Sequence, residues 1–441
     1  NHMHIFGDPK PDATKGIIER KRLFNLPRSS WTDYNDSLIS KGGGIFDRSA
    51  KSIDLSPEIQ KRFDISKDSV TPNELIRALL TAKTDLLWFG GIGTYLKETG
   101  ESHLDVGDRA NDSIRINANQ LNTKVVGEGA NLGVTQLARI EAALSGVRLY
   151  ADSIDNSAGV DCSDHEVNIK ILIDQVMAKG GLTQKQRNSL LAKMTTEVGL
   201  QVLVDNYSQT QAINTILYQG MGIFDNQVRL MRSLEKGGRL NREVEFLPDD
   251  ETLVDRGASR TGLTGPEIAV LMSYAKIWVN EELLASDLPD DVALQDDLIA
   301  YFPKPLRKPY KKEIIKHRLN REIVATQATN SVINRAGGTF INQLMESTGM
   351  PTSDVVRAYI ITRQCLGMRA MWAEIDALDN KVPAAVQTQM RLDTNQLTEW
   401  VTLWFLRNGR RPLDIASHVD EFADGFNALY GCLGKCLPKH Y

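Results

Sequence analysis

The periodicity of apolar residues changes near residue 164, and this change constrains the fold more than any single motif. Before residue 164, short apolar runs alternate with glycine-rich turns and helical stretches. After it, strand patterns almost vanish and apolar residues recur at helical spacing, as in Thr264–Leu284. Alternation of strands and helices is typical of a mostly parallel sheet. We therefore predict an α/β domain over residues 1–163 and a long all-α domain over residues 164–441.

Three strands are expected in the α/β domain, each ending in a turn. The first covers His4–Phe6 and the second Asp85–Phe89, and the third covers Lys124–Glu128. Residues 9–70 are rich in turn formers, and they include a triple glycine at 42–44 that we expect in a loop. We therefore interpret residues 9–70 as an insertion packed on the sheet domain.

Several helix starts carry capping signals. Thr71 precedes Pro72, Thr135 precedes an apolar helical stretch, and Thr264 stands three residues before Glu267 in a capping-box pattern. These signals predict helices that begin at each threonine. In the all-α domain we expect further helices around residues 183–204, 208–235, 353–378, 384–408 and 414–433.

Composition limits the class of protein. A chain of 441 residues is too long for one ordinary core, and 41% hydrophobic with 24% charged residues is typical of a soluble globular protein. A net charge of −4 gives no general attraction to nucleic acid or anionic membranes. No apolar run is long enough to span a bilayer. Four cysteines without framework spacing favour a reducing compartment, so we expect a cytoplasmic protein.

The ends of the three strands carry residues that a dinucleotide site needs. Asp8 follows the first strand, Gly90 and Gly91 follow the second, and Gly129-Ala130-Asn131 follows the third. In open parallel sheets ligands bind beyond the carboxyl ends of the strands, and an acid there can accept a hydrogen bond from a ribose hydroxyl. Each of these features is also compatible with a simple turn. Their recurrence at three strand ends favours a nucleotide site.

The segment "KVVGEGANLG", residues 124–133, departs from the dinucleotide fingerprint. The pattern G-x-G-x-x-G requires its third glycine at position 132, which is Leu132, and Gly133 comes one residue late. As a phosphate-binding loop this segment is therefore a weak candidate.

Residues 150–170 combine several carboxylates with a histidine and a cysteine. Asp161 and His165 would share a face if both were helical, which invites a metal interpretation, and Cys162 with His165 invites a nucleophile and its base. However, residues 156–159 favour a loop, and a helix capped at Ser163 or Asp164 explains the same pattern. We predict no metal site.

Two other patterns are interpreted as structural. Asn and Thr residues recur at buried-looking positions of the helical stretch 318–337, where they could form hydrogen bonds between helices. Cys432 and Cys436 lie one helical turn apart, which favours core packing.

Several long segments resemble the glutamate dehydrogenase superfamily. "KVVGEGANLGVT" and "NSAGVDCSDHE" are similar to its cofactor turn and to the segment that closes its active site. "ERKRLFNLPRSSW", "GGIGTYLK", "VGDRAND" and "GLTGPEIAVLMSYAK" are similar in particular to the large bacterial NAD-specific glutamate dehydrogenases. This resemblance covers nearly the whole chain. It implies an incomplete Rossmann-like domain, whose first strand and glycine-rich turn lie upstream of residue 1, followed by the all-α domain.

The resemblance also implies roles for individual residues. Residues 127–133 would be the turn beside the nicotinamide ribose. The implied NAD-binding residues are Asp8, Gly90, Gly91, Gly129, Ala130, Asn131 and Asn156. Val160 and Ser163 would line the glutamate side-chain pocket, with Ser163 bonded to the γ-carboxylate. Ala158-Gly159 and Leu132-Gly133 depart from the smaller members of the superfamily.

The implied reaction is the NAD-dependent oxidative deamination of L-glutamate to 2-oxoglutarate and ammonia. The catalytic lysine and aspartate of the family would lie upstream, so no catalytic residue is expected in this chain and we predict that it is inactive alone. Its expected partners are the N-terminal remainder of the enzyme and further copies of the same chain, without nucleic acid or membrane. Two alternatives stay open: a leucine, phenylalanine or valine dehydrogenase on the same fold, and a helical module that serves assembly or regulation.

Overall fold

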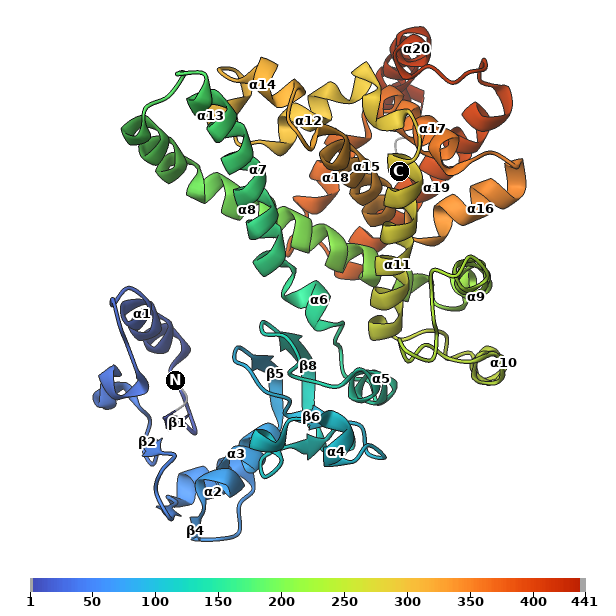
Figure 1. Ribbon diagram of the computed structural model, residues 1–441. Coiled ribbons are helices and arrows are strands. Elements are labelled where there is room, and N and C mark those ends of the chain that lie inside the picture. Colours follow the sequence, from blue (N-terminus) through green and yellow to red (C-terminus); the bar gives the residue numbers. More distant parts are fainter. Residues whose placement is uncertain (1–2, 437–441) are drawn as a thin grey trace. The chain divides into compact units, whose positions relative to one another are not determined.

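The structure is a computed structural model that describes residues 3–436 (Figure 1). The chain divides into two compact units, Asn1–Asn156 and Ser157–Tyr441, which we call the first unit and the helical unit. The first unit mixes helices with short strands, whereas the described part of the helical unit contains helices and no strand. The predicted order of an α/β region followed by an all-α region is therefore confirmed.

The strands of the first unit pair two by two, so that residues 3–156 hold four two-stranded sheets. β1 pairs with β2 and β3 with β4, both antiparallel, whereas β5 pairs with β8 and β6 with β7 in parallel. The strands are β1 (His4–Gly7), β2 (Gly44–Asp47), β3 (Ile53–Asp54), β4 (Ser69–Val70), β5 (Thr84–Phe89), β6 (Leu96–Lys97), β7 (Ile116–Asn117) and β8 (Thr123–Glu128).

The antiparallel pairing of β1 with β2 differs from the predicted arrangement, in which β1 would belong to one mostly parallel sheet. Its partner comes from within residues 9–70, and Ile5 lies opposite Phe46 in the antiparallel register. The triple glycine is only partly a loop: Gly42, with a φ of +81°, forms the turn, but Gly44 already belongs to β2. An antiparallel partner needs no long crossover, which explains how this nearby segment can pair with β1.

Two small hydrophobic cores stabilise the first unit. One gathers Phe89, Leu96 and Val126 against Ala138 and neighbouring apolar residues, so it joins β5, β6 and β8 to α5 (Gln136–Leu144). The other joins β1 to residues 53–75 and includes the fully buried Ile59. Residues 9–70 therefore supply much of the second core.

The helices of the first unit are short. Thr71 caps α3 and Thr135 caps α5, as predicted. Thr71 and Glu74 also form a capping box, in which each side chain accepts a hydrogen bond from the other residue's backbone N–H. The helices are α1 (Ala13–Phe24), α2 (Pro57–Phe63), α3 (Pro72–Leu80), α4 (His103–Val106), α5 (Gln136–Leu144) and α6 (Asp152–Asp155).

The helical unit is built around α17, which is buried on nearly every side and packs against α11, α19 and α20. Thr264 and Glu267 form the predicted capping box of α11. The helices are α7 (Ser157–Ala178), α8 (Gln184–Gln219), α9 (Met221–Lys236), α10 (Asp250–Ser259), α11 (Gly265–Leu284), α12 (Gln295–Tyr301), α13 (Lys304–Arg307), α14 (Lys311–Ile315), α15 (Asn320–Ala336), α16 (Thr339–Thr348), α17 (Thr352–Cys365), α18 (Met368–Asp376), α19 (Ala384–Asn408) and α20 (Ile415–Cys436).

Two predicted helices of the helical unit have different bounds. α8 runs unbroken through residues 205–207, and the break occurs at Gly220, whose φ is +52°. The helix predicted over 353–378 is divided at Gly367, whose φ is +59°. Both breaks use a positive φ, which glycine adopts without steric cost.

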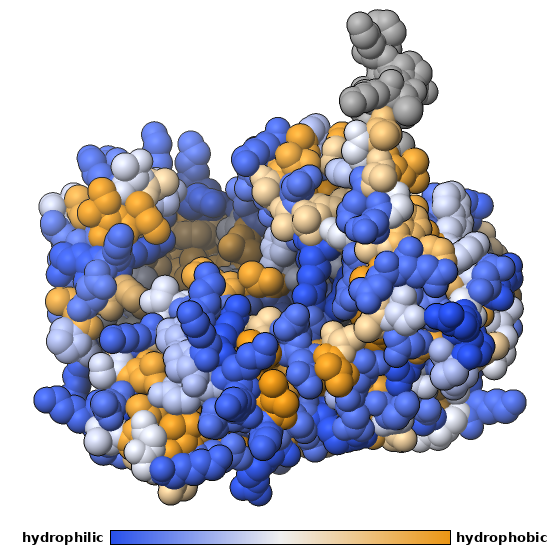
Figure 2. All heavy atoms as spheres, turned by 90° about the horizontal axis from the view of Figure 1, so that it is seen from above, coloured by the Kyte–Doolittle hydropathy of each residue, from blue (hydrophilic) through white to orange (hydrophobic). Residues whose placement is uncertain are grey.

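The surface of the protein is largely polar. Hydrophilic residues cover most of the face in Figure 2, with apolar side chains scattered among them. Among the described residues, no helix combines the length and the apolar character that a membrane crossing requires.

Candidate functional site

The β5–β8 pair brings two of the predicted strand ends to one edge. Phe89 lies opposite Glu128 in the parallel register, so Gly90 and Gly129 leave the two strands at neighbouring points. Carboxyl ends of parallel strands are the usual place for a ligand in α/β proteins. We therefore take this edge as the candidate site.

The Trp88 indole is the close neighbour of Gly127 on β8 and of Gly129 directly after it. A Cβ added to Gly127 would lie 2.5 Å from Cε3 of Trp88, and one added to Gly129 would lie 2.3 Å from its Cζ2. Any side chain at either position would displace the indole, which is itself 58% exposed. By contrast, a Cβ on Gly91 would meet no atom within 4 Å. The Trp88 indole thus fills the space that the missing side chains of Gly127 and Gly129 leave open, whereas Gly91 faces open space.

A buried ion pair anchors the base of the turn after β8. Arg139 of α5 forms two hydrogen bonds with the Glu128 carboxylate, from Nε at 2.7 Å and from Nη2 at 2.8 Å. Asp152 lies 3.4 Å from the same guanidinium. Burial opposes the charge of Arg139, but its hydrogen bonds to Glu128 and the nearby aspartates together raise its pKa. Arg139 is therefore a permanent cation at this position.

The one-turn helix α6 holds the turn itself. Asp155 accepts a hydrogen bond from the backbone N–H of Glu128, and Asp152 accepts one from the N–H of Leu132, both at 2.9 Å. Burial raises the pKa of Asp155 above its usual range, and its bond from Glu128 partly offsets this effect. Both ends of residues 128–132 are thus fixed by carboxylates of α6.

The structure brings together two of the predicted cofactor-binding amides. Nδ2 of Asn156 donates a hydrogen bond to Oδ1 of Asn131 at 2.8 Å. The pair leaves the NH₂ group of Asn131 as a donor and the Oδ1 atom of Asn156 as an acceptor. A donor beside an acceptor is the complement of a primary carboxamide. Ala130 lies half-buried between Gly129 and Asn131 on the same turn.

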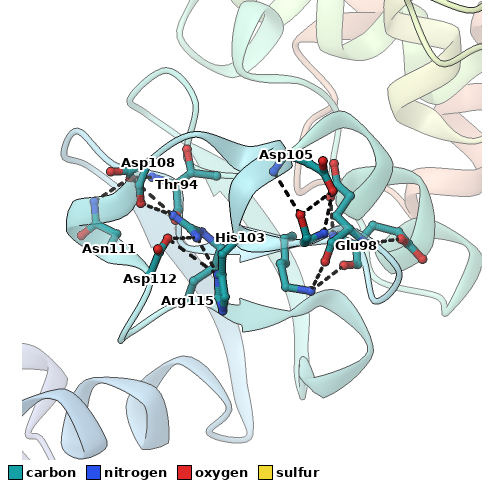
Figure 3. A network of polar contacts seen from close by, with 11 residues as sticks. Thr94, Glu98, His103, Asp105, Asp108, Asn111, Asp112 and Arg115 are labelled. Atoms are coloured by element: carbon teal, nitrogen blue, oxygen red, sulfur yellow. Dashed lines mark hydrogen bonds and ion pairs between the residues drawn. The ribbon is translucent and has the colours of Figure 1, made fainter.

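The segment after Gly90 and Gly91 is fixed by a polar network around the buried Arg115 (Figure 3). The guanidinium donates to the carbonyl of Thr94 at 2.8 Å and to Asp112 at 2.6 Å, and it contacts His103 at 2.8 Å. Asp108 in turn accepts a hydrogen bond from the N–H of Thr94 at 2.8 Å. These contacts hold residues 94–115 in one conformation beside the candidate site.

Asp8 lies at the end of β1, and its contacts stay within its own region. Its Oδ1 atom accepts hydrogen bonds from the Ser40 hydroxyl and from the backbone N–H groups of Lys10 and Ser40. Within residues 3–436, no contact joins Asp8 to Gly90 or Asn131. These bonds hold the carboxylate of Asp8 in a turn.

The loop predicted at residues 156–159 is wrong. α6 and α7 are separated by Asn156 alone, and Ser163 and Asp164 lie inside α7 and do not cap it. Val160 and Ser163 are exposed on this helix, where the Ser163 hydroxyl donates to the carbonyl of Gly159 at 3.0 Å. One Gly in a first helical turn does not prevent a helix that tertiary packing stabilises, which explains the error. Both residues belong to the helical unit.

The Cys162 and His165 side chains differ in environment. Cys162 is exposed, whereas His165 is buried and stacks on Tyr301 with ring centroids 4.5 Å apart. His165 lies near Asp161 and Asp205. One ring nitrogen of His165 and one carboxylate oxygen of each aspartate lie within 4.8 Å of one another. Lys276 is close enough to Asp161 and Asp205 for both carboxylates to favour its charged form. Its ammonium supplies the positive charge that such a cluster needs, so we propose no metal here.

The chain matches two family models along most of its length. Residues 1–216 match the model of the bacterial NAD-glutamate dehydrogenase catalytic domain, and residues 260–441 match the model of the glutamate dehydrogenase C-terminal region. The chain belongs to the bacterial NAD-specific glutamate dehydrogenase family. Every residue of the candidate site lies within the catalytic-domain match, which includes the start of the helical unit.

Relatives with this family name align with nearly the whole chain. NAD-specific glutamate dehydrogenases of Halomonas elongata, Pseudomonas aeruginosa and Mycobacterium tuberculosis are 50%, 51% and 43% identical over 440, 429 and 435 residues. These alignments cover 99%, 97% and 97% of the chain but only 27%, 26% and 27% of the relatives. The chain thus spans about a quarter of the length of these glutamate dehydrogenases.

Sequence reasoning missed the residues that support the site. Asp152 and Asp155 stand out in the sequence only as members of the acidic run in residues 150–170, and Glu128 and Arg139 are not among the residues predicted for the site. One signal was available: a strand that ends in glutamate, followed eleven residues later by an arginine on an otherwise apolar helix face, predicts a buried pair.

Proposed function

We propose that the chain forms the cofactor-side portion of an NAD-dependent glutamate dehydrogenase that converts L-glutamate to 2-oxoglutarate and ammonia. The observation that carries this proposal is the Asn131–Asn156 amide pair, held by α6 at the carboxyl edge of a parallel strand pair. The names of the relatives support the substrate and the cofactor.

The residues of the candidate site fit the nicotinamide end of NAD. The free donor of Asn131 and the free acceptor of Asn156 match the two groups of a carboxamide, and Gly91 leaves room for a planar ring. When bound, NAD would accept the hydride removed from the α-carbon of the amino acid. The chain's own contribution is to orient the nicotinamide so that one ring face meets the substrate.

Asp8, Gly90, Gly129 and Ala130 complete the proposed NAD site. The carboxylate of Asp8 would accept a hydrogen bond from the adenosine ribose, which favours NAD over its 2′-phosphorylated form. We further propose that the first strand and the glycine-rich turn of this nucleotide-binding domain precede residue 1. The outer edge of β5 supports this idea, because within residues 3–156 it pairs with no strand and its Leu86 is 55% exposed.

Val160 and Ser163 are proposed to contact the substrate. The Ser163 hydroxyl would turn from the carbonyl of Gly159 to donate to the γ-carboxylate of glutamate, whereas an apolar substrate such as leucine offers no acceptor for it. The catalytic lysine and aspartate are proposed to lie upstream, where they would polarise the carbonyl and move protons. The chain would then be inactive without that part of the enzyme.

The test uses the intact enzyme that contains this chain. Asn131→Ala and Asn156→Ala should each raise the KM for NAD about tenfold or more, since each removes one carboxamide contact. Asn119→Ala, an exposed asparagine of the same unit, is the matched control and should leave the KM unchanged. Unchanged NAD kinetics in both site variants would refute the proposed site.

Substrate choice is tested separately. Ser163→Ala should raise the KM for glutamate while leaving the KM for NAD within about twofold, because in this proposal the hydroxyl contacts the substrate and not NAD. Faster turnover of leucine than of glutamate by the unmodified enzyme would favour the alternative dehydrogenase. Turnover of glutamate by the 441-residue chain alone would contradict an upstream catalytic lysine.

We also propose that the helical unit joins copies of the enzyme. Its last two long helices expose large apolar side chains, among them Trp400 at 61% and Tyr430 at 64% exposure, and exposed aromatic residues are enriched at protein interfaces. Gel filtration should show an oligomer that Trp400→Glu dissociates. An oligomer that is unchanged by this variant would contradict the proposed interface.

A further inference from the structure

Asp152 of α6 contacts the backbone on both sides of the Asn131–Asn156 amide pair. Its Oδ2 atom accepts a hydrogen bond at 2.9 Å from the N–H of Leu132, the residue directly after Asn131. Its backbone carbonyl accepts another at 2.8 Å from the N–H of Asn156. The two amide side chains themselves meet at 2.8 Å. A single aspartate thus holds the backbone next to each amide.

The side-chain contact of Asp152 stabilises an unfavourable backbone conformation. Leu132 has a φ of +65°, in the left-handed region that residues with a Cβ avoid for steric reasons. Its side chain is 68% exposed, so packing does little to offset this cost. A hydrogen bond from an N–H to a carboxylate is about twice as strong as one between neutral groups. The bond from Leu132 to Asp152 can therefore offset the steric cost.

The conformation of Leu132 determines where Asn131 lies. On the other side of Leu132, the carbonyl of Gly133 accepts a hydrogen bond at 2.9 Å from the N–H of Tyr95. The peptide bond that joins Asn131 to Leu132 is planar and does not rotate. Because Gly133 is held, a change in the φ of Leu132 moves Asn131. The Asn131 side chain would then leave the position in which it meets Asn156.

Asp152 is itself fixed by its neighbours. Its Oδ1 atom accepts a hydrogen bond at 2.8 Å from the N–H of Ser153 and lies 3.4 Å from Nη2 of Arg139. Arg139 is in turn held by two hydrogen bonds to Glu128. The Asp152 side chain is only 18% exposed, so little water competes for these contacts. The carboxylate is therefore preorganised, as a residue that orients a binding group needs to be.

We propose that Asp152 is a positioning residue for NAD. Its carboxylate holds Leu132 in the left-handed conformation, and this conformation directs the NH₂ group of Asn131 toward the carboxamide of NAD. Asp152 does not touch the cofactor in this proposal, because its effect passes through Leu132 and Asn131. The inference rests on the proposed NAD site and adds the residue that sets the geometry of that site.

A double-mutant cycle in the intact enzyme tests the role of Asp152. Asp152→Ala should raise the KM for NAD about tenfold, because it removes the bond that offsets the steric cost at Leu132. In a Leu132→Gly background, the same substitution should raise this KM at most about threefold, since glycine adopts the left-handed conformation without steric cost. The KM for glutamate should stay within about twofold throughout. A merely structural role of Asp152 would give the same factor in both backgrounds.

Two further variants guard against folding defects. Ser153→Ala, on an exposed position of the same α6, is the matched control and should leave the KM for NAD unchanged. Leu132→Val leaves Asp152 in place but increases the steric cost, because β-branched residues tolerate a positive φ least. It should raise the KM for NAD about threefold. If circular dichroism shows that Asp152→Ala is unfolded, the result with Leu132→Val decides.

Asn131→Ala separates this inference from the proposed NAD site. An unchanged KM for NAD in a folded Asp152→Ala variant, or the same increase in both backgrounds, would overturn the positioning role. If Asn131→Ala raises this KM while Asp152→Ala does not, the NAD site stands and only the role of Asp152 fails. If neither variant raises it, the NAD site and the positioning role fail together.

Discussion

Leu132 occupies the position at which a dinucleotide fingerprint has its third glycine, and its backbone behaves as a glycine would. Its φ is +65°, in the left-handed region that L-residues other than glycine avoid. The N–H of Leu132 donates to Asp152 at 2.9 Å, which holds the residue in this conformation. Its side chain is 68% exposed and contributes little burial. Leu132 therefore adopts a conformation that carries a steric cost for any residue with a Cβ.

Leu132→Gly should raise the free energy of unfolding of the first unit by up to about 1 kcal/mol. Glycine relieves the left-handed strain, and the gain exceeds the greater flexibility of the unfolded chain. Leu132→Ala is the matched control, because alanine loses the same exposed side chain but keeps the Cβ that causes the strain. Differential scanning calorimetry measures both variants. Equal stability of the glycine and alanine variants would show that the backbone at this position carries no strain.

At the scale of elements, α6 is a single turn of helix that organises the candidate site. Its carboxylates reach backbone groups 20 and 27 residues away, on Leu132 and Glu128. Helical periodicity cannot be recognised over four residues, and the sequence does not show such distant partners. The acidic run therefore suggested a metal site and a loop, whereas its first two aspartates fix a turn.

The contribution of the buried Glu128–Arg139 pair to stability can be measured with variants. Arg139→Ala should lower the free energy of unfolding by about 3–5 kcal/mol, because it leaves the Glu128 carboxylate buried without its partner. Urea denaturation measures the loss. The double variant Glu128→Gln with Arg139→Met removes both charges and should recover most of it. A double variant that is as unstable as Arg139→Ala would show that the loss comes from packing and not from the uncompensated charge.

Elements with local signals were predicted well from the sequence. The caps at Thr71, Thr135 and Thr264 are confirmed, because each depends on residues within one turn of the helix. The helix breaks at Gly220 and Gly367 were missed, since glycine inside a helical pattern does not reveal whether tertiary packing will favour a positive φ. The contact between Asn131 and Asn156 follows from α6, which the sequence did not reveal, although both residues had been named.

At the scale of the whole molecule, one cluster of ionisable side chains lies where helices α7, α8 and α11 meet. Asp161 and His165 come from α7, Asp205 from α8 and Lys276 from α11, so no single segment of sequence predicts their cluster. Burial lowers the pKa of Lys276 to about 8, although the two carboxylates oppose this effect. Burial also lowers the pKa of His165. At neutral pH the cluster therefore combines a lysine cation with the nearby carboxyl groups of Asp161 and Asp205.

Because of Asp205, the free energy of unfolding is expected to fall as the pH rises. Burial raises its pKa from 3.8 in the unfolded chain to about 6. The folded state then favours the protonated acid, so its stabilising contribution is complete below pH 3.8 and is lost as the pH rises through about 6. The loss at neutral pH is on the order of 3 kcal/mol. Lys276 titrates at higher pH and leaves this window unaffected.

Asp205→Asn removes the titrating group without changing its shape. The stability of this variant relative to the unchanged chain should rise between pH 4 and pH 6 and stay constant up to pH 7, because asparagine cannot ionise. Urea denaturation followed by circular dichroism at pH 4, 5, 6 and 7 measures this difference. Asp225→Asn, an exposed acid of the same unit, should show a flat difference over the same range. A flat difference for Asp205→Asn as well would mean that its carboxylate is no harder to ionise in the folded chain than in the unfolded one.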